Sequence, residues 1–131
     1  MGSFGEDIEF KTSGEGDIVD ITAKVASVVK RGKITDGIVC VSVVGSTASI
    51  TTVEFEPGLV KDIGEAVERL FPKGLVYEHH LRWGDGNGHS HVRATFLGPS
   101  VTVPVRAGKL VLGTIIAKGS NALRLRRVWS E

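Results

Sequence analysis

The sequence predicts an α+β domain in which short antiparallel strands dominate and two helices pack on one side of the sheets. The chain has 131 residues, enough for one domain with a buried core and short for two. Several β-branched apolar runs end at Gly, Pro, Asn or Asp, as strands do. Two segments show the apolar spacing of a helix. We therefore expect a single domain over residues 1–131, built as two packed antiparallel sheets with both helices on one side.

The first elements are expected to be a strand and a helix. Residues 3–12 alternate loosely between apolar and polar side chains and predict the opening strand. The segment Ile21–Gly32 places valines at the spacing of one buried helix face, with Asp20 or Thr22 as the N-cap and glycine at its end. Its β-branched residues lower the intrinsic helix propensity, so tertiary packing must stabilise this helix.

The middle of the chain predicts two strands followed by a helix. Ile38–Val44 is nearly all apolar, the pattern of a strand covered on both faces, and Thr47–Phe55 follows as its neighbour. Pro57–Phe71 begins with proline in the first turn, which suits a helix, and is followed by Pro-Lys-Gly, which ends one. Its expected buried stripe consists of Leu59, Ile63, Ala66, Val67 and Leu70.

The rest of the chain predicts strands. Leu75–Glu78 is a short one, His91–Leu97 and Val101–Val105 are separated by Gly-Pro, and Lys109–Ile116 and Leu123–Trp129 follow. Apolar residues take alternate positions in several of these segments, as in half-buried strands.

Composition excludes several classes of partner. Lysine and arginine number 16 and aspartate and glutamate 15, so no basic field predicts nucleic-acid binding. No apolar run is long enough to span a bilayer, and the N-terminus lacks the pattern of a signal peptide. The single cysteine, Cys40, cannot form an internal disulfide. We expect a cytoplasmic protein without nucleic-acid or membrane partners.

All four histidines fall between positions 79 and 91. In an extended segment, His89 and His91 would point to the same face and could bind one metal ion. His79 or His80 could supply a third imidazole, and Glu54 or Asp85 a carboxylate. Three protein ligands and an open position would make a catalytic centre for a divalent ion such as zinc or magnesium. The alternative is that the His-x-His pair lies on a solvated sheet face or fills the core.

Further candidate residues surround this histidine cluster. Arg93 would share the face of His91 in a strand and could neutralise a phosphate or carboxylate. Glu54 could orient a ligand or serve as a base, or could be an exposed charge. Trp83 could stack on a flat ring or cover a subunit interface. Gly84–Gly88 lacks the spacing and the following helix of a dinucleotide-binding loop, so we expect a turn that positions the histidines.

Several short motifs are spread over nearly the whole chain. The most specific is Asn87–His91 followed by Leu97–Ser100. The remaining motifs are Gly16–Thr22, Asp36–Val39, Ser46–Ile50, Tyr77–His79 and Leu112–Thr114. Together these motifs resemble the YjbQ-like family, often labelled secondary thiamine-phosphate synthase and long classed as uncharacterised.

The resemblance implies a sandwich-like antiparallel domain, a homotrimer, and a pocket in which histidines hold a metal ion. By position, the histidines of the family correspond to His79 and His91, and Glu54 is what is left of an Asn-Glu pair. Gly45 stands where members usually have histidine, and His80 where they usually have aspartate.

Three functions are compatible with these residues. The first is a thiamine-phosphate synthase, which joins a pyrimidine pyrophosphate to a thiazole phosphate. A metal on His79, His89 and His91 would bind the leaving pyrophosphate, Arg93 would stabilise its charge, and Glu54 would orient a ligand or water. The second is a non-catalytic homotrimer that binds a metal and a small phosphorylated ligand. The third is a metal-dependent phosphate-ester hydrolase.

Overall fold

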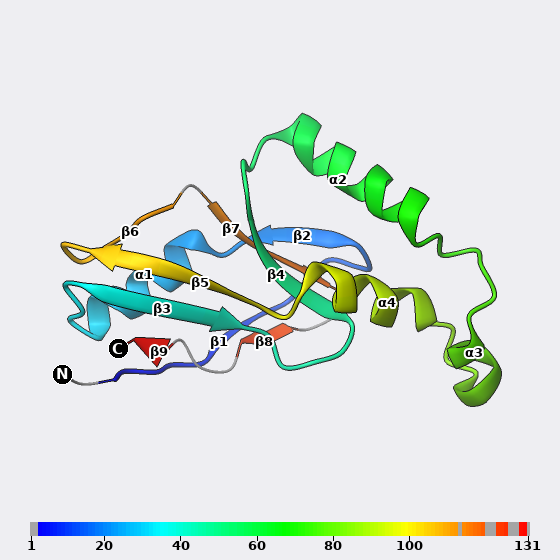
Figure 1. Ribbon diagram of the computed structural model, residues 1–131, viewed down its shortest axis with the longest axis horizontal. Helices are drawn as coiled ribbons and strands as arrows, with labels where there is room; N and C mark the ends of the chain where they lie inside the picture. The colour runs from blue at the N-terminus through cyan, green and yellow to red at the C-terminus, as the bar shows by residue number, and fades with distance from the viewer. Residues whose placement is uncertain (1–2, 113, 120–122, 126–128, 131) are drawn as a thin grey trace.

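The computed structural model describes residues 3–112, 114–119, 123–125 and 129–130. Strands and helices alternate irregularly along the chain (Figure 1). Their order is β1 (Ile8–Phe10), β2 (Asp17–Asp20), α1 (Thr22–Arg31), β3 (Gly37–Ser42), β4 (Ala48–Val53), α2 (Pro57–Leu70), α3 (Glu78–Trp83), α4 (Gly88–Leu97), β5 (Ser100–Arg106), β6 (Lys109–Leu110), β7 (Thr114–Gly119), β8 (Leu123–Leu125) and β9 (Trp129–Ser130).

The strands pair exclusively antiparallel within the described residues and form three sheets. The largest has the order β6-β5-β3-β9, the second β2-β7-β4, and the third is the pair β1-β8. The α+β class and its antiparallel sheets are therefore confirmed. Two helices were predicted, whereas the described part of the chain contains four.

The core lies between the sheets and α1. Val39 and Val41 of β3 are fully buried, and Val25 and Val28 of α1 are buried with them. The alternation of β3 and the helical spacing of α1 place these side chains on the faces that meet. The predicted helix at this position is confirmed. Its first turn is held by the carboxylate of Asp20, which accepts hydrogen bonds from the backbone N–H and the hydroxyl of Thr22.

Helix α2 is also confirmed, and its N-cap is Glu56. The Glu56 carboxylate accepts hydrogen bonds from the backbone N–H groups of Gly58 (2.6 Å) and Leu59 (2.9 Å). These bonds hold the pKa of Glu56 below its ordinary value. Only Val67 of this helix is buried, because α2 makes sparse contact with the sheets. Helices α2, α3 and α4 lie toward one end of the molecule, whereas α1 lies beside the large sheet, so the helices do not share one side (Figure 1).

Strand boundaries differ from the prediction at several places. The opening strand is confined to β1, and β2 precedes α1 where no separate strand was expected. The predicted strand Lys109–Ile116 is divided into β6 and β7. Within the predicted strand Leu123–Trp129, the described backbone forms β8 and the start of β9, and residues 126–128 lie outside the described residues. The predicted strand at Leu75–Glu78 is wrong, since α3 begins there.

The segment that carries His89 and His91 is a helix, α4, and its prediction as a strand is wrong. Apolar Val92, Ala94 and Phe96 alternate with polar neighbours and imitate the period of a strand. Burial follows the helical period instead: Ala94 is buried, whereas Phe96 is 73% exposed. The helix packs against β4 through its buried side and ends at a glycine with φ +86°.

None of the helices in the described ranges is long and apolar enough to cross a membrane.

Candidate functional site

Two of the four histidines face each other across the junction of α3 and α4. The ring centroids of His79 and His91 are 4.5 Å apart. His79 Nε2 is buried, has no hydrogen-bond partner, and lies 3.5 Å from a carboxylate oxygen of Asp85. The glycine-rich turn between the helices therefore does position the histidine region, and it adds a carboxylate beside the imidazole pair.

His89 lies elsewhere, because two residues along an α-helix correspond to a rotation of about 200°. Its side chain is 2% exposed, and its Nε2 contacts a carboxylate oxygen of Glu15 in the turn before β2. The other Glu15 oxygen lies 2.5 Å from Lys73 Nζ. The His89 and Lys73 contacts lower the pKa of Glu15 from its ordinary value to about 2. The expectation that His89 and His91 point to one face is therefore wrong.

His80 has a structural contact with the start of α4. Its Nε2 accepts a hydrogen bond from the backbone N–H of Gly88 at 3.0 Å. A side chain at position 88 would not fit, because a Cβ there would lie 2.7 Å from Cβ of Tyr77. This close approach explains why the sequence has glycine directly before the His-x-His pair.

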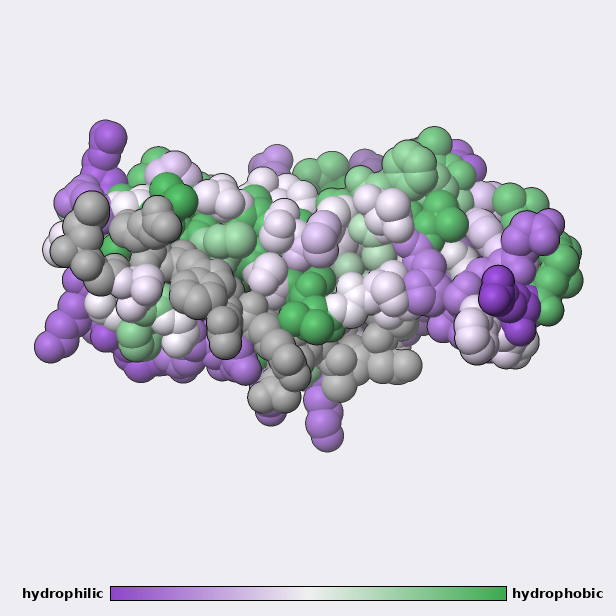
Figure 2. All heavy atoms as spheres, turned by 60° about the horizontal axis from the view of Figure 1, so that its bottom comes forward, coloured by the Kyte–Doolittle hydropathy of each residue, from purple (hydrophilic) through white to green (hydrophobic). Residues whose placement is uncertain are grey.

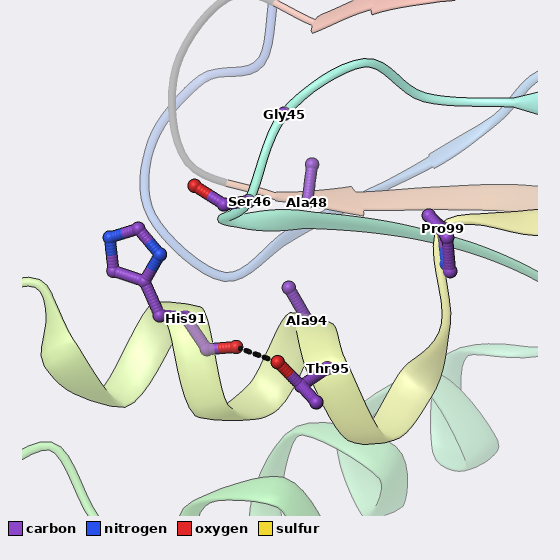
Figure 3. A pocket seen from close by; sticks show the side chains of 7 residues that line it. All are labelled: Gly45, Ser46, Ala48, His91, Ala94, Thr95 and Pro99. Carbon is purple, nitrogen blue, oxygen red and sulfur yellow. Dashed lines mark hydrogen bonds between the residues drawn. The ribbon is translucent and has the colours of Figure 1, made fainter.

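A pocket of about 210 Å³ opens beside His91, between α4 and the connection from β3 to β4. Its lining residues are Gly45, Ser46, Ala48, His91, Ala94, Thr95 and Pro99. His91 from α4 and Ser46 from the connection before β4 place their side chains at the same end of the lining (Figure 3). His91, Ala94 and Thr95 share this face of α4, because they are three and four residues apart.

Two backbone hydrogen bonds fix the pocket wall by joining the segment after α4 to β4 and to the residue that follows β3. Ile50 N–H donates to the carbonyl of Gly98 (3.1 Å), and Val43 N–H donates to the carbonyl of Pro99 (2.9 Å). Gly45 has φ +152°, a conformation that side-chain-bearing residues rarely adopt. Gly45 thus forms part of the pocket wall in a conformation that suits glycine.

The two predicted catalytic residues do not line this pocket. Arg93 is on the His89 side of α4, where its guanidinium donates to the carbonyl of Phe71 (2.9 and 2.7 Å) and to Glu68 (2.5 Å). The backbone N–H of Lys73 and the Arg93 guanidinium hold the pKa of Glu68 below its ordinary value. Arg93 therefore ties α4 to the end of α2.

Glu54 is exposed and follows the last residue of β4. The pocket lies at the other end of that strand, at Ala48. Six residues of extended chain span roughly 20 Å, so the Glu54 backbone is far from the pocket of its own chain.

A metal centre with three histidines does not form in the described part of the chain. His79 and His91 come together, His89 is bound to Glu15, and no group of three or more His, Cys, Asp or Glu side chains in the described residues is placed to hold a metal ion. The buried Nε2 of His79 has no hydrogen-bond partner among the described residues and is compatible with a ligand role, with His91 and the Asp85 carboxylate as its neighbours.

Sequence reasoning missed two residues of this region. Ser46 follows Gly45 and opens one of the resembling motifs, which was a usable signal. Glu15 lies 74 positions before His89 in a glycine-flanked turn, and nothing local connects the two.

The fold and the histidine pocket define a class of small α+β proteins, and comparison with known proteins identifies the family. Residues 6–117 match the family model described as UPF0047 protein YjbQ-like, so the chain belongs to this family. A UPF0047 protein from Archaeoglobus fulgidus is 41% identical over 125 residues, which cover 93% of this chain and 95% of that protein. The UPF0047 protein YugU of Bacillus subtilis is 31% identical over 109 residues, 82% of this chain and 80% of that protein.

Solved structures show the same fold. A YbjQ-like protein of unknown function from Sulfolobus solfataricus P2 superposes with a TM-score of 0.88 at 32% identity and covers 99% of both chains. A YjbQ/UPF0047 family protein from Clostridium acetobutylicum gives a TM-score of 0.84 at 28% identity, covering 94% of this chain and 98% of the other. The resemblance inferred from the motifs is confirmed.

Proposed function

We propose that this chain binds the phosphate end of a small phosphorylated ligand in the pocket beside His91. The observation that carries the proposal is the presence of the His91 imidazole and the Ser46 hydroxyl at the same end of a pocket otherwise lined by small residues (Figure 3). Both groups donate hydrogen bonds to phosphate oxygens, and Gly45, Ala48 and Ala94 leave room for the anion.

The size of the pocket supports a small group rather than a whole organic molecule. Its volume of about 210 Å³ lies below the roughly 300 Å³ at which pockets for drug-sized ligands begin. The ligand would therefore place its phosphate inside and leave its organic part at the mouth. Thiamine phosphate, the ligand class implied by the family resemblance, has this shape.

A divalent metal ion would enter this proposal at the His79–His91 pair. Two imidazole nitrogens suit zinc better than magnesium, which prefers oxygen ligands. Its remaining donors would be ligand phosphate oxygens or groups from another copy, because the described part of one chain provides no third donor in place.

Binding without turnover is the form of this function that the geometry supports best. Thiamine-phosphate synthesis and phosphate-ester hydrolysis both need a charged group at the reacting phosphate. Arg93 is engaged with the end of α2, and Glu54 lies at the far end of β4. Synthesis of thiamine phosphate is therefore the more specific functional hypothesis. It requires charged catalytic groups from outside this pocket.

Titration with inorganic phosphate and with thiamine phosphate, followed by calorimetry, tests the proposal. We expect saturable binding of both, and a loss of roughly tenfold or more in affinity in His91→Ala, equivalent to about 1.4 kcal/mol. Ser46→Ala should weaken binding as well. His80→Gln, which keeps an acceptor for the Gly88 N–H, is the matched control and should bind like the wild type.

The same preparations separate the alternatives. Turnover of a pyrimidine pyrophosphate with a thiazole phosphate would establish thiamine-phosphate synthase activity. Release of phosphate from simple esters would establish hydrolase activity. If the wild type binds one zinc ion per chain and His79→Ala binds none, His79 and His91 are established as metal ligands. Equal affinity in the wild type and His91→Ala would contradict the proposed pocket.

Assembly into a homotrimer also remains a proposal, and one surface supports it. Apolar side chains are exposed among polar ones at the end of the molecule that carries α3 (Figure 2). The most exposed apolar residues on α2, α3, α4 and the connection from α2 to α3 are Leu70, Leu75, Val76, Leu81, Trp83 and Phe96. Large apolar side chains exposed in such numbers are compatible with an interface. Light scattering should give about three times the chain mass of 14.0 kDa; a monomer mass would contradict it.

A further inference from the structure

One carboxylate contacts α4, which carries His91, and the connection that leads to α3, which carries His79. Glu15 Oε2 lies 2.5 Å from Lys73 Nζ, and its Oε1 contacts His89 Nε2. Lys73 is in the connection that leads into α3 and His79, and His89 stands two residues before His91 on α4. Glu15 therefore links α4 to the connection before α3, in addition to the direct bond between His80 of α3 and Gly88 of α4.

The geometry of α4 converts the His89 contact into an orientation of His91. Residues two positions apart on a helix are separated by about 200° of rotation, so the two side chains leave opposite sides of α4. Any rotation of α4 that moves His89 moves His91 by the same angle. A fixed His89 thus determines the direction in which His91 enters the pocket.

His89 is held by one polar contact within the described residues. Its Nδ1 is buried and has no hydrogen-bond partner, so Glu15 alone fixes the ring by hydrogen bonding. The ring is 2% exposed, and solvent cannot replace this contact. The contacts with His89 and Lys73 lower the pKa of Glu15 to about 2, so the carboxylate stays ionised well below neutral pH.

We propose that Glu15 is a positioning residue for the pocket: by holding His89 and Lys73 together, it sets how His79 and His91 face each other. The ligand-binding consequence rests on the proposed function, whereas the orientation of the imidazoles does not. Glu15 contacts neither the pocket nor its lining residues, so its effect on the pocket is indirect.

The test compares Glu15→Ala, Glu15→Gln and the wild type by the imidazole ¹H–¹³C resonances and by affinity for inorganic phosphate. In Glu15→Ala, the resonances of His79 and His91 should move, and the phosphate Kd should rise several-fold. Glu15→Gln keeps an oxygen acceptor for His89 and should restore both readouts toward the wild type. Glu6→Ala is the matched control, because it breaks a surface ion pair with Arg31 and leaves α4 untouched.

Unchanged His79 and His91 resonances in folded Glu15→Ala would overturn the proposal. If Glu15→Ala does not fold, Lys73→Met provides the test. This variant removes only the contact between Glu15 and the connection before α3, so the His79 resonance should move more than that of His91. No movement of either would overturn the proposal. Failure of the wild type to bind phosphate would contradict the proposed function, and the resonance comparison would still decide the role of Glu15.

Discussion

The contact between Glu15 and His89 predicts a measurable dependence of stability on pH. The pKa of Glu15 falls from its ordinary value of 4.5 to about 2 in the folded protein, first through the His89 hydrogen bond and then through Lys73. Because the folded-state pKa is the lower one, the stabilisation is complete above about pH 4.5 and is lost as the pH falls toward 2.

The size of this stabilisation follows from the shift and the exposure. At 1.36 kcal/mol per pKa unit, the shift corresponds to an upper value of roughly 3 kcal/mol. The Glu15 side chain is 34% exposed, so solvent screening reduces the expected contribution to about 1–2 kcal/mol. For a domain of this size, that is equivalent to about 3–10 °C in Tm.

Urea unfolding of the wild type and Glu15→Gln at pH 5.5 and pH 3 measures the effect. The wild type should be more stable by about 1–2 kcal/mol at pH 5.5, and the difference should shrink by about half or more at pH 3. Comparing the two proteins cancels the titration of the other carboxyl groups. Glu6→Gln, which loses a more exposed ion pair, should change stability less and serves as the control. A difference between the wild type and Glu15→Gln that is the same at both pH values would refute the reasoning.

Three further predictions concern the elements that hold the site. Val41→Ala, at a fully buried position of β3, should cost about 2–3 kcal/mol in urea unfolding, whereas Val76→Ala, 80% exposed, should stay within about 0.5 kcal/mol; similar losses would contradict the assigned core. Gly88→Ala should destabilise by about 1–3 kcal/mol, because its Cβ would meet Tyr77, and wild-type Tm would show that the helices have room to separate. Arg93→Met should increase hydrogen exchange in α2 more than in α1, since it removes the bonds to the end of α2; equal protection would mean that Arg93 does not hold this helix.

Local patterns were sufficient where one buried face dominated the sequence. The valine spacing of α1 and the apolar stripe of α2 identified both helices, and the β-branched run of β3 identified a core strand. The period identified the type of each element but not every buried residue, since Leu70 of the predicted α2 stripe is 70% exposed and Ile38 of β3 is 45% exposed.

The histidine segment shows where local patterns fail. Val92, Ala94 and Phe96 alternate with polar residues and predict a strand, but α4 buries Ala94 and leaves Phe96 exposed. A period of two and a helical period cannot be told apart reliably in ten residues when few of them are strongly apolar. The error assigned the same role to two residues that the helix separates: His89 is a buried partner of Glu15, whereas His91 lines the pocket.

The sequence by itself determined the family, the α+β class, the antiparallel sheets and the region in which function is to be sought. Each of these depends on motifs, composition or periodicity that can be read within a short window. Only the tertiary structure decided which histidines meet, since His79 and His91 come from different helices that Glu15, far away in the chain, helps to link. Contacts between distant residues leave no local pattern, because they arise from the packing of elements that are each specified separately.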